Sequence, residues 1–548
     1  MSNKERDIQT TVEKLKNIYD ASQINAAYFI CHRHINNENQ IALFYEDSSG
    51  YTSKWTFQQL SEHSKYLAGF LQDTGIKKAD NVAVMLPKCP EIIISALSIW
   101  HLGAVYIPLF TAFGPDAIDY RLIDSNCNVV ITDENNYHKI LETNAYKNGL
   151  LKIITVRKET DEHNHKNSYN FWSVIKTSTP IETYELLEGN SPMILIYTSG
   201  TTGVPKGVMV PIKALASFEA YMHFGLYLNN NDNYWNMADP GWAYGLYYNL
   251  IGAMLLGKST LFYNAPFEPE KIYYILEKYK ITNFTTAPTA YRVIKALDNK
   301  NYKKYKICVT KASSAGEPLN PEVIEWFKNN WGTTIHDHYG QTEIGMVINN
   351  HHHPSLKKEI KIGSMGHSMP GFRMTVVDST GAKLEAFKEG HLAVDIKHSP
   401  LMWFQGYFNE SVKNNDRFIN NNYYLTGDKV SYDNEGYFYF SGRSDDIILS
   451  AGYRISPLEV ENAIMKHESV AEVAVVGISD KLKSQTIKAY IVLKKGIKPT
   501  EALAEDIKSF VKTHLSAHQY PKYIEFIDYL PKTPSGKIQR FMLKNNNH

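Results

Sequence analysis

The chain is organised around the stretch YTSGTTGVPKGVMV, from Tyr197 to Val210. This stretch sets four small hydroxyl residues and three glycines around Pro205 and Lys206. Such residues let backbone N–H groups approach a polyphosphate, and the lysine adds positive charge, although the Walker A spacing is absent. A Ser/Thr/Gly cluster is often a flexible linker, but the flanking apolar runs MILIYTS and VMVP predict two strands. The stretch therefore predicts a phosphate-binding loop within a hairpin.

The composition is that of a globular protein without a strongly charged partner. The 548 residues exceed one hydrophobic core and predict about three or four domain-sized units. A formal net charge of +1 gives no reason to expect nucleic acid or an anionic membrane as partner. The start of the chain lacks the apolar core of a signal peptide, and the most apolar run, ALSIWHLGAVYIPLF, is shorter than the roughly 20 residues of a membrane span. We therefore expect a cytoplasmic protein with no membrane span.

The cysteines and a run of histidines give no clear metal site. The four cysteines are scattered without a C-x-x-C pair, so we expect buried small side chains in a reducing compartment: Cys31, Cys89, Cys127 and Cys308. His351, His352 and His353 are consecutive and cannot all face one ion, so they predict an exposed loop.

Short apolar runs alternate with helical patterns between about residues 41 and 133. IALFYED, NVAVMLP and NVVITD predict strands, whereas FQQLSEHSKYLAGFLQDTG and EIIISALSIWHLGA predict helices. The region from about 134 to 190 is polar and predicts an irregular excursion. Beyond the phosphate loop, ITNFTTAPTAYRVI predicts a strand and a helix, and the last hundred residues predict a small α+β unit. This alternation is typical of an α/β fold with covered sheets.

The segment Thr198–Gly207 resembles the phosphate-loop signature of AMP-forming acyl-CoA synthetases of the adenylate-forming superfamily, which includes beetle luciferases and the adenylation domains of peptide synthetases. The resemblance covers nearly the whole chain from about Ile41, with the order of motifs preserved. It implies a large N-terminal domain, residues 1–444, of α/β subdomains plus a small β-rich subdomain. A smaller mobile α+β domain, residues 445–548, would follow a hinge at Asp445.

The resemblance implies that ATP and Mg²⁺ are held by several separate motifs. The phosphate loop supplies Thr198, Ser199, Gly200, Thr201, Thr202, Gly203 and Lys206. The segment before DHYGQTEIG supplies an adenine site of Gly316, Glu317 and Pro318. Within DHYGQTEIG, Asp337 would lie near the adenine amino group and Tyr339 would offer it a flat face, with Gln341 adjacent. The Thr342 hydroxyl suits a phosphate oxygen, and the Glu343 carboxylate suits Mg²⁺.

The C-terminal third carries the remaining implied contacts. Asp428 would accept hydrogen bonds from both ribose hydroxyls, since a carboxylate has no donor of its own. Arg443 would contact ribose or phosphate and Arg454 the ATP phosphates, while Gly452 would keep the pantetheine tunnel of CoA open. In LPKTPSGKIQR, the resemblance makes Lys537 the catalytic lysine, although a lysine so near a C-terminus is by default a solvated charge.

The aromatic run after Asp239-Pro240-Gly241 predicts a helix that packs a core or lines a pocket for an apolar acid. The resemblance implies an acyl pocket of Trp242, Ala243, Tyr244, Gly245, Ala315 and Gly340. Acetate-specific relatives carry tryptophan where this chain has Gly340, so the missing indole predicts room for a short-, branched- or medium-chain acid. Tyr244 and Tyr247 could refill that space, which leaves acetyl-CoA synthetase as the alternative. A Gly340→Trp exchange is expected to move preference toward acetate or propionate.

The resemblance therefore predicts a ligase that uses ATP, Mg²⁺ and CoA to activate a small carboxylic acid. Competing hypotheses are an enzyme that loads a carrier protein, a luciferase-like oxygenase, and a non-enzymatic nucleotide-binding module that would have lost the terminal lysine. A homo-oligomer, and enzymes that acylate Lys537 and so remove its charge, are further partners that the resemblance admits.

Overall fold

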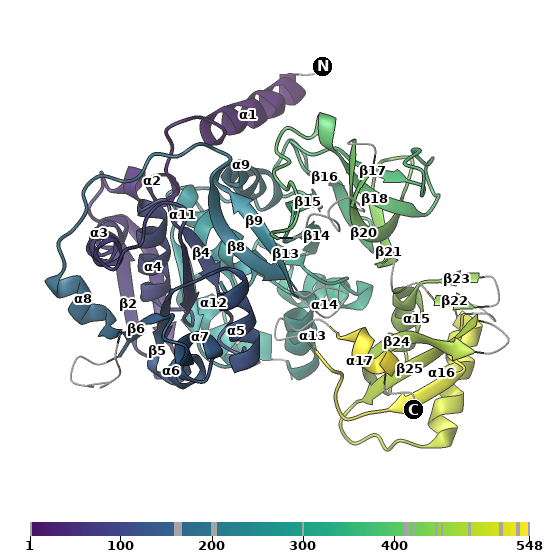
Figure 1. Ribbon diagram of the computed structural model, residues 1–548. Coiled ribbons are helices and arrows are strands. Elements are labelled where there is room, and N and C mark those ends of the chain that lie inside the picture. The colour runs from purple at the N-terminus through teal and green to yellow at the C-terminus, as the bar shows by residue number, and fades with distance from the viewer. Residues whose placement is uncertain are drawn as a thin grey trace. The chain divides into compact units, whose positions relative to one another are not determined.

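The computed structural model describes residues 3–157, 167–198, 205–298, 301–409, 417–419, 422–443, 446, 448–450, 453–480, 484–514, 519–532 and 538–545. Their contacts divide the chain into two compact units (Figure 1). The first unit comprises residues 1–362, 366–373 and 395–416, and the second comprises residues 363–365, 374–394 and 417–548.

A seven-stranded sheet in the order β7-β6-β5-β3-β4-β8-β9 carries the first half of the first unit. Its strands pair in parallel except for the antiparallel hairpin β8–β9, which confirms the hairpin predicted around the phosphate loop. Strands of this kind are apolar on both faces and must be covered. Their bounds are β3 Asn81–Met85, β4 Val105–Pro108, β5 Val129–Asp133, β6 Lys152–Val156, β7 Ser168–Asn170, β8 Pro192–Thr198 and β9 Lys206–Pro211.

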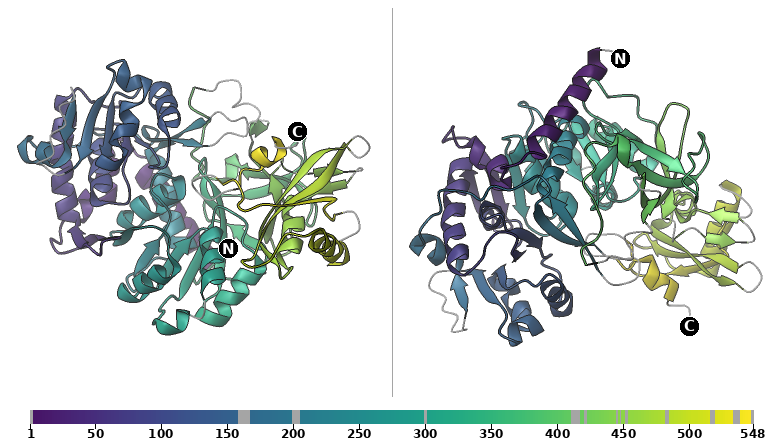
Figure 2. Two further views of the ribbon diagram at one scale, coloured as in Figure 1. Left: turned by 90° about the horizontal axis from the view of Figure 1, so that it is seen from below. Right: turned by 45° about the horizontal axis from the view of Figure 1, so that its top comes forward.

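Helices lie on both sides of these parallel strands (Figure 2). Helix α3 Phe57–Asp73 begins with a capping box between Thr56 and Gln59 and packs beside the almost wholly buried helix α4 Pro90–His101. Apolar side chains of α5 Pro115–Asp124, α6 Glu134–Leu141 and α7 Asn144–Lys147 share a core with the sheet. Helix α8 Phe171–Thr177 packs against β6 and β7.

The prediction of an irregular segment from 134 to 190 is wrong. That region contains α6, α7, β6, β7 and α8. The short apolar run of β6 was overlooked because polar residues surround it, yet Ile153 and Ile154 are fully buried between neighbouring strands. Short elements between polar connections carry a weak periodic signal, and tertiary packing decides their state.

A second sheet contains strands in the order β10-β12-β13-β14-β15-β16, which lie in the first unit except for the first two residues of β16. One of its faces packs a core with α12 Pro269–Lys278, α13 Pro288–Leu297 and α14 Pro321–Trp331. Several short helical segments also belong to this unit: α9 Leu215–Ala220, π-helix η3 Tyr221–Gly225, α10 Ala243–Gly245, π-helix η4 Leu246–Gly252 and α11 Ala253–Leu255. The strands are β10 Tyr234–Asn236, β12 Asn283–Thr286, β13 Lys311–Ala315, β14 Ile335–Gln341, β15 Gly345–Asn349 and β16 Ser364–Ser368.

The first unit also holds a small sheet in which β1 pairs in parallel with β11 and antiparallel with β2. Its strands are β1 Ile41–Asp47, β2 Thr52–Thr56 and β11 Thr260–Asn264, and two helices precede it, α1 Asn3–Tyr19 and α2 Ala26–Ile30. Across the described residues, none of the helices combines the length and apolarity that crossing a membrane demands.

The second unit contains two groups of strands. The first is β17 Met374–Val377, β18 Gly390–Asp395, β19 Phe418–Ile419, β20 Tyr423–Tyr432 and β21 Phe438–Arg443. The second is β22 Ile448–Ser450, β23 Tyr453–Ile455, β24 Val470–Asp480, β25 Ser484–Leu493 and β26 Tyr523–Phe526, with α15 Pro457–Met465, α16 Glu501–His514 and α17 Arg540–Asn545. Ile507 and Val511 of α16 are fully buried in the core of this segment, and its strands and helices confirm the predicted α+β character.

Candidate functional site

The hairpin β8–β9 holds both ends of the predicted phosphate loop. Thr198 and Lys206 are paired across the hairpin, and the Thr198 hydroxyl donates to the Lys206 carbonyl oxygen at 3.4 Å. Five predicted loop residues lie outside the described residues: Ser199, Gly200, Thr201, Thr202 and Gly203. The described strands therefore fix where the loop leaves and re-enters the sheet.

One tyrosine connects the predicted phosphate-loop lysine with the predicted Mg²⁺ ligand. The Lys206 Nζ lies 4.9 Å from the centroid of the Tyr407 ring, and the Tyr407 hydroxyl donates to Glu343 Oε1 at 2.8 Å. Tyr407 is held there because it forms a β-bridge with Val208 of β9. A cation and a carboxylate from distant motifs therefore both contact the Tyr407 side chain, one at the ring and one at the hydroxyl. Tyr407 carries no motif signal and was not predicted.

The carboxyl ends of β13 and β14 bring the predicted adenine-binding residues together. Ala315 is paired with His338 in this parallel arrangement, so Gly316 and Tyr339 follow at the same edge of the sheet. Gly316 has φ +101°, a backbone conformation that glycine adopts readily. This edge is where a ligand of an open α/β sheet is expected.

Asp337 of β14 carries an unsatisfied acceptor in this region. Its Oδ1 atom is buried and has no hydrogen-bond partner among the described residues. Burial raises the pKa of the Asp337 carboxyl well above its usual value, and hydrogen bonds from the backbone N–H groups of His338 and Leu319 oppose that rise. A buried acceptor without a donor is costly, so the site fits a ligand that brings an N–H, such as the adenine amino group.

The Glu317 side chain is already engaged by helix α13. It forms an ion pair with Arg292, N to O 2.5 Å, and its two carboxylate oxygens each lie 2.9 Å from the Thr289 hydroxyl. Both charged side chains are largely buried, which favours a fixed geometry. Glu317 therefore anchors the turn after β13, which carries the predicted adenine-binding residues.

Four of the six predicted acyl-pocket residues, Trp242 to Gly245, lie on and just before α10, whereas Ala315 and Gly340 lie on β13 and β14. The Trp242 ring packs against Phe110 and Phe113, with ring centroids 5.3 and 5.7 Å apart, and its buried Nε1 has no partner among the described residues. The Tyr247 hydroxyl donates to the Thr342 carbonyl oxygen at 3.1 Å. These contacts join the predicted pocket to the turn that carries Thr342 and Glu343.

Gly340 is packed more tightly than expected. A Cβ atom at this position would lie 2.2 Å from the Gly345 carbonyl oxygen and 2.7 Å from the Met346 Cα, because β14 and β15 approach closely across a β-bulge at Tyr339/Gly340. The expected free space for an indole is therefore not present at the Cβ position. A bulky side chain at 340 requires a shift of β15.

The second unit carries the remaining predicted residues. Asp428 of β20 is directly paired with Arg443 of β21, and Asp428 is buried whereas Arg443 is exposed. Arg454 lies in β23 opposite Leu449. Asp445, Gly452 and Lys537 lie outside the described residues.

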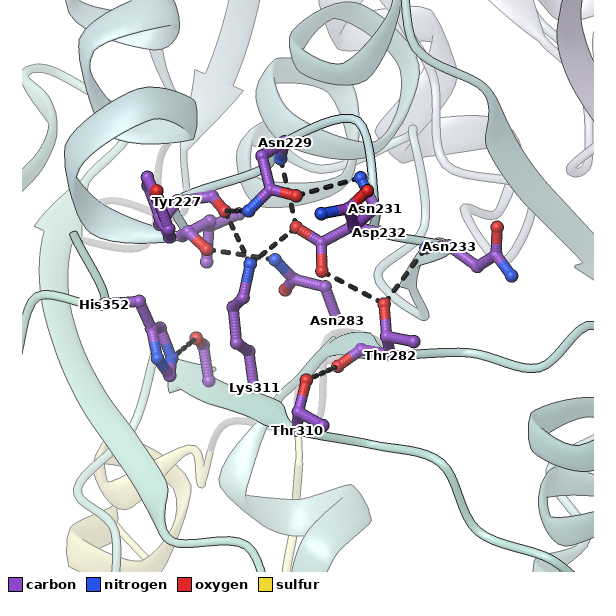
Figure 3. A network of polar contacts seen from close by, with 12 residues as sticks. Tyr227, Asn229, Asn231, Asp232, Asn233, Thr282, Asn283, Thr310, Lys311 and His352 are labelled. Carbon is purple, nitrogen blue, oxygen red and sulfur yellow. Dashed lines mark hydrogen bonds and ion pairs between the residues drawn. The ribbon is translucent and has the colours of Figure 1, made fainter. Parts of the chain in front are cut away.

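The prediction of an exposed loop at His351–His353 is wrong. His351 and His352 are buried, because this segment hydrogen-bonds to the end of η3 through the His352 N–H and the Gly225 carbonyl oxygen at 2.9 Å. The His352 Nε2 lies 3.0 Å from the Ser313 hydroxyl, at the margin of the Lys311–Asp232 network shown in Figure 3. Lys311 donates to Asp232 at 2.6 Å and to the Tyr227 carbonyl oxygen at 2.7 Å.

His352 belongs to a buried cluster with His336 and His338, in which potential ligand nitrogens lie within 4.8 Å of one another. Hydrogen bonds, however, engage His336 Nδ1, both nitrogens of His338 and His352 Nε2, and the rings of His336 and His352 are stacked at 3.6 Å. Burial lowers the pKa of all three rings, that of His336 to about 4. The cluster is thus held as neutral, hydrogen-bonded imidazoles. The sequence signal that could have indicated this cluster is the spacing of His336 and His338, which lie two residues apart on one strand.

Known proteins resemble this chain over most of its length. The family described as AMP-binding enzyme matches residues 32–408, and the AMP-binding enzyme C-terminal domain matches residues 459–537. The chain is 35% identical over 528 residues to the acetyl-coenzyme A synthetase of Bacillus subtilis (strain 168), covering 95% of this chain and 90% of that protein. It is 34% identical to the mitochondrial acyl-coenzyme A synthetase ACSM3 of Rattus norvegicus, covering 92% and 86%. A crystal structure of Brucella canis acyl-CoA synthetase matches with TM-score 0.76 and 41% identity over 96% of this chain and 94% of that one.

Proposed function

Because the chain belongs to the AMP-binding enzyme family and is an adenylate-forming acyl-CoA synthetase, we propose that its substrate is a short-, branched- or medium-chain carboxylic acid larger than acetate. The enzyme uses ATP, Mg²⁺ and CoA, and forms an acyl-adenylate before the thioester. We place this activity in the cytoplasm. The alternatives are acetate as substrate and a carrier protein as acceptor.

The observation that carries the proposed site is the connection Lys206–Tyr407–Glu343. It links the exit of the phosphate loop to the turn after β14 within one unit. A carboxylate that attacks ATP faces repulsion between two anions, so the site must supply positive charge and hold the reactants in line. Lys206, together with the loop from Thr198 to Gly203, would hold the departing pyrophosphate. Bound Mg²⁺ supplies charge neutralisation at the phosphates, with Glu343 as its protein ligand and Thr342 beside it.

The nucleotide would be oriented by the edge of the second sheet. The unsatisfied Asp337 Oδ1 supports an adenine whose amino group points to β14, with Tyr339 and the backbone of Gly316–Pro318 at its faces and Gln341 nearby. In the second unit, the paired residues Asp428 and Arg443 would take the ribose, and Arg454 the phosphates.

The domain boundary is proposed at residues 444/445, with Asp445 as hinge between a 1–444 and a 445–548 domain. In this scheme Lys537 bridges the acyl carboxylate and the α-phosphate during adenylate formation. Rotation at the hinge then withdraws Lys537 and brings Gly452 to the pantetheine of CoA. Acylation of Lys537 would remove its charge and stop the first half-reaction. A homo-oligomer is compatible with this scheme.

The acid would lie against Trp242, Ala243, Tyr244 and Gly245, close to Ala315 and Gly340. The relatives do not decide its size, because one is named an acetyl-coenzyme A synthetase and another an acyl-coenzyme A synthetase. The aromatic lining supports an acid with more apolar surface than acetate, since each buried methylene contributes about 0.8 kcal/mol.

A Lys537→Ala variant tests the division of labour between the half-reactions. We expect it to lose adenylate formation by about a hundred- to a thousandfold, because removing one preorganised group that stabilises developing charge costs roughly 10²–10³ in rate. Thioester formation from supplied acyl-adenylate should remain near the wild-type rate. The control is Lys522→Ala, which removes an exposed lysine of the same unit that pairs with Asp480. Equal loss of both half-reactions in Lys537→Ala would contradict the proposal.

A further inference from the structure

A cavity of about 520 Å³ is lined by three segments of the first unit: π-helix η3, the loop that leads from η3 to β10, and the segment after α11. None of its lining residues belongs to the proposed active site. The π-helix also carries Tyr221, whose hydroxyl oxygen lies 2.9 Å from that of Tyr244 in the proposed acyl pocket. Small-molecule pockets have volumes of roughly 300–1,000 Å³, so this cavity is large enough for a small organic ligand.

The loop that lines the cavity is held in one conformation by the Lys311–Asp232 network (Figure 3). Both side chains of this ion pair are largely buried, and Lys311 also donates to the Tyr227 carbonyl oxygen. Tyr227 has φ +49°, a left-handed conformation that is uncommon for a tyrosine and persists where surrounding contacts impose it. Asp232 accepts in addition from the Asn229 N–H at 3.0 Å. The wall is therefore preformed, and the charge of the nearby Asp232 carboxylate is already neutralised.

The amide side chains that line the cavity have their oxygens engaged and their nitrogens available. Asn230 Oδ1 accepts from the Lys258 ammonium, so its Nδ2 remains a donor. Asn229 Oδ1 accepts from the Asn231 N–H at 2.9 Å, and its Nδ2 makes only a long contact of 3.5 Å with the Tyr227 carbonyl oxygen. The Lys258 ammonium carries three protons, of which Asn230 takes one. This side of the cavity therefore offers several hydrogen-bond donors next to a full positive charge.

His223 of η3 adds a donor from another side of the cavity. Within the described part of the chain, its ring contacts Phe224 and His353, with centroids 4.7 and 5.0 Å away, and makes no hydrogen bond. Burial lowers the pKa of His223, so the ring is neutral at neutral pH and carries one N–H. No carboxylate is found among the described residues that line the cavity. Its electrostatics therefore favour an anion.

We propose that this cavity binds a small organic anion, whose carboxylate or phosphate group accepts hydrogen bonds from Lys258, Asn230 and His223. Hydrogen bonds to an ionised acceptor are stronger than those between neutral groups. Leu228 and Leu256 also line the cavity, and the apolar part of the ligand packs against them. The site is additional to the proposed function, because it needs neither ATP nor CoA.

His223 gives a local readout of binding at this cavity. Enzyme with isotopically labelled histidine is titrated with hexanoate, hexyl phosphate, acetate and inorganic phosphate, and NMR signals of the His223 ring are identified by their loss in His223→Gln. We expect a saturable shift with hexanoate or hexyl phosphate, with a Kd about tenfold or more below that of the matching anion without the chain. The tighter of the two chain-bearing anions identifies the charged group. No saturable shift with any of these anions, or equal affinity with and without the chain, would overturn the inference.

A Lys258→Met variant removes the charge and keeps a long side chain. We expect Kd for the chain-bearing anion to rise about tenfold or more, because a hydrogen bond between charged groups is lost. Lys271→Met is the matched control: Lys271 is exposed on α12, with its Nζ 6.0 Å from the Tyr274 ring, and its removal should leave Kd unchanged.

Hexanoate that acts on His223 from the acyl pocket would bind equally well to Lys258→Met, so an unchanged Kd in this variant would contradict the proposed site. Asn230→Ala is a second variant on an exposed part of the loop, and it should raise Kd about threefold or more even where Lys258→Met fails to fold. The titration requires no turnover. Its failure is therefore distinct from a failure of the proposed function, which pyrophosphate release measures.

Discussion

Asp337 gives the sharpest test at the scale of a single residue. Its buried Oδ1 fits the adenine amino group, so Asp337→Ala should raise KM for ATP roughly tenfold by removing one hydrogen bond to a carboxylate. ITP carries a carbonyl where ATP carries the amino group, and its KM should change far less. Steady-state kinetics with both nucleotides measure the preference. An equal rise in KM for ATP and ITP would show that Asp337 does not distinguish the two bases.

Gly340 has a structural role that limits its use as a specificity probe. Gly340→Ala should lower the free energy of unfolding by about 1–3 kcal/mol, because the new Cβ meets the backbone of β15 at 2.2 Å. Gly114→Ala is the control, because that position has open space and φ −82°, and its cost should stay below about 1 kcal/mol. Urea unfolding compares the two. Equal stability of both variants would contradict the tight packing.

The sequence predicts a functional residue where that residue belongs to a motif. It does not predict a residue whose role depends on a contact that the fold creates. DHYGQTEIG identifies Asp337 and Tyr339 through their spacing, and the strand β14 confirms that they lie on one element. Tyr407 and Arg292 have no local signature. They become apparent only because the fold brings them to Glu343 and Glu317 from 64 and 25 residues away.

Buried histidines on β14 and on the segment after β15 make the stability of the fold depend on pH. Burial lowers the pKa of His336 and His351 to about 4 each, and lowers that of His338 and His352 well below the usual value. Between pH 6.5 and about 4 these rings take up protons only on unfolding. Stability is therefore full above pH 6.5 and falls as the pH falls toward 4.

His336→Asn isolates one of these protons and keeps a donor for the Asn350 carbonyl oxygen. The slope of unfolding free energy against pH between about 4.5 and 6 should decrease by about 1 kcal/mol per pH unit relative to the wild type. The raised pKa of Asp337 acts with the opposite sign but is common to both proteins, so it cancels in the difference. Urea titrations over this range give the slope. Parallel pH curves for wild type and variant would refute the neutral buried ring.

Elements with long periodic patterns were predicted correctly, and elements defined by packing were not. The helices α3 and α4 and the strands β3, β5 and β8 follow their apolar periods. The π-helical turns of η3 and η4 have no such signal, although they carry Tyr221 and lie next to Tyr244. The prediction for His351 and His352 was wrong because a polar run predicts an exposed segment. Backbone hydrogen bonds to η3 instead hold this segment in the interior.

At the scale of the whole molecule, the order of motifs predicted the α/β fold with a separate α+β segment at the C-terminus. The sheets and helices of both units confirm this fold class. The proposed hinge at Asp445 and the catalytic role of Lys537 lie outside the described residues and stay predictions. Sequence motifs identify such residues, but their proposed roles depend on a proposed domain motion that no pattern specifies.

The most direct measurement is pyrophosphate release from ATP and Mg²⁺, with and without CoA, over acids from acetate to octanoate, including isobutyrate and 2-methylbutyrate. Sustained turnover should require CoA and be highest for an acid of four to eight carbons or a branched acid. Highest turnover with acetate would keep the ligase and contradict the proposed pocket. Pyrophosphate release that CoA does not stimulate, without acyl-CoA as product, would contradict CoA as the acceptor.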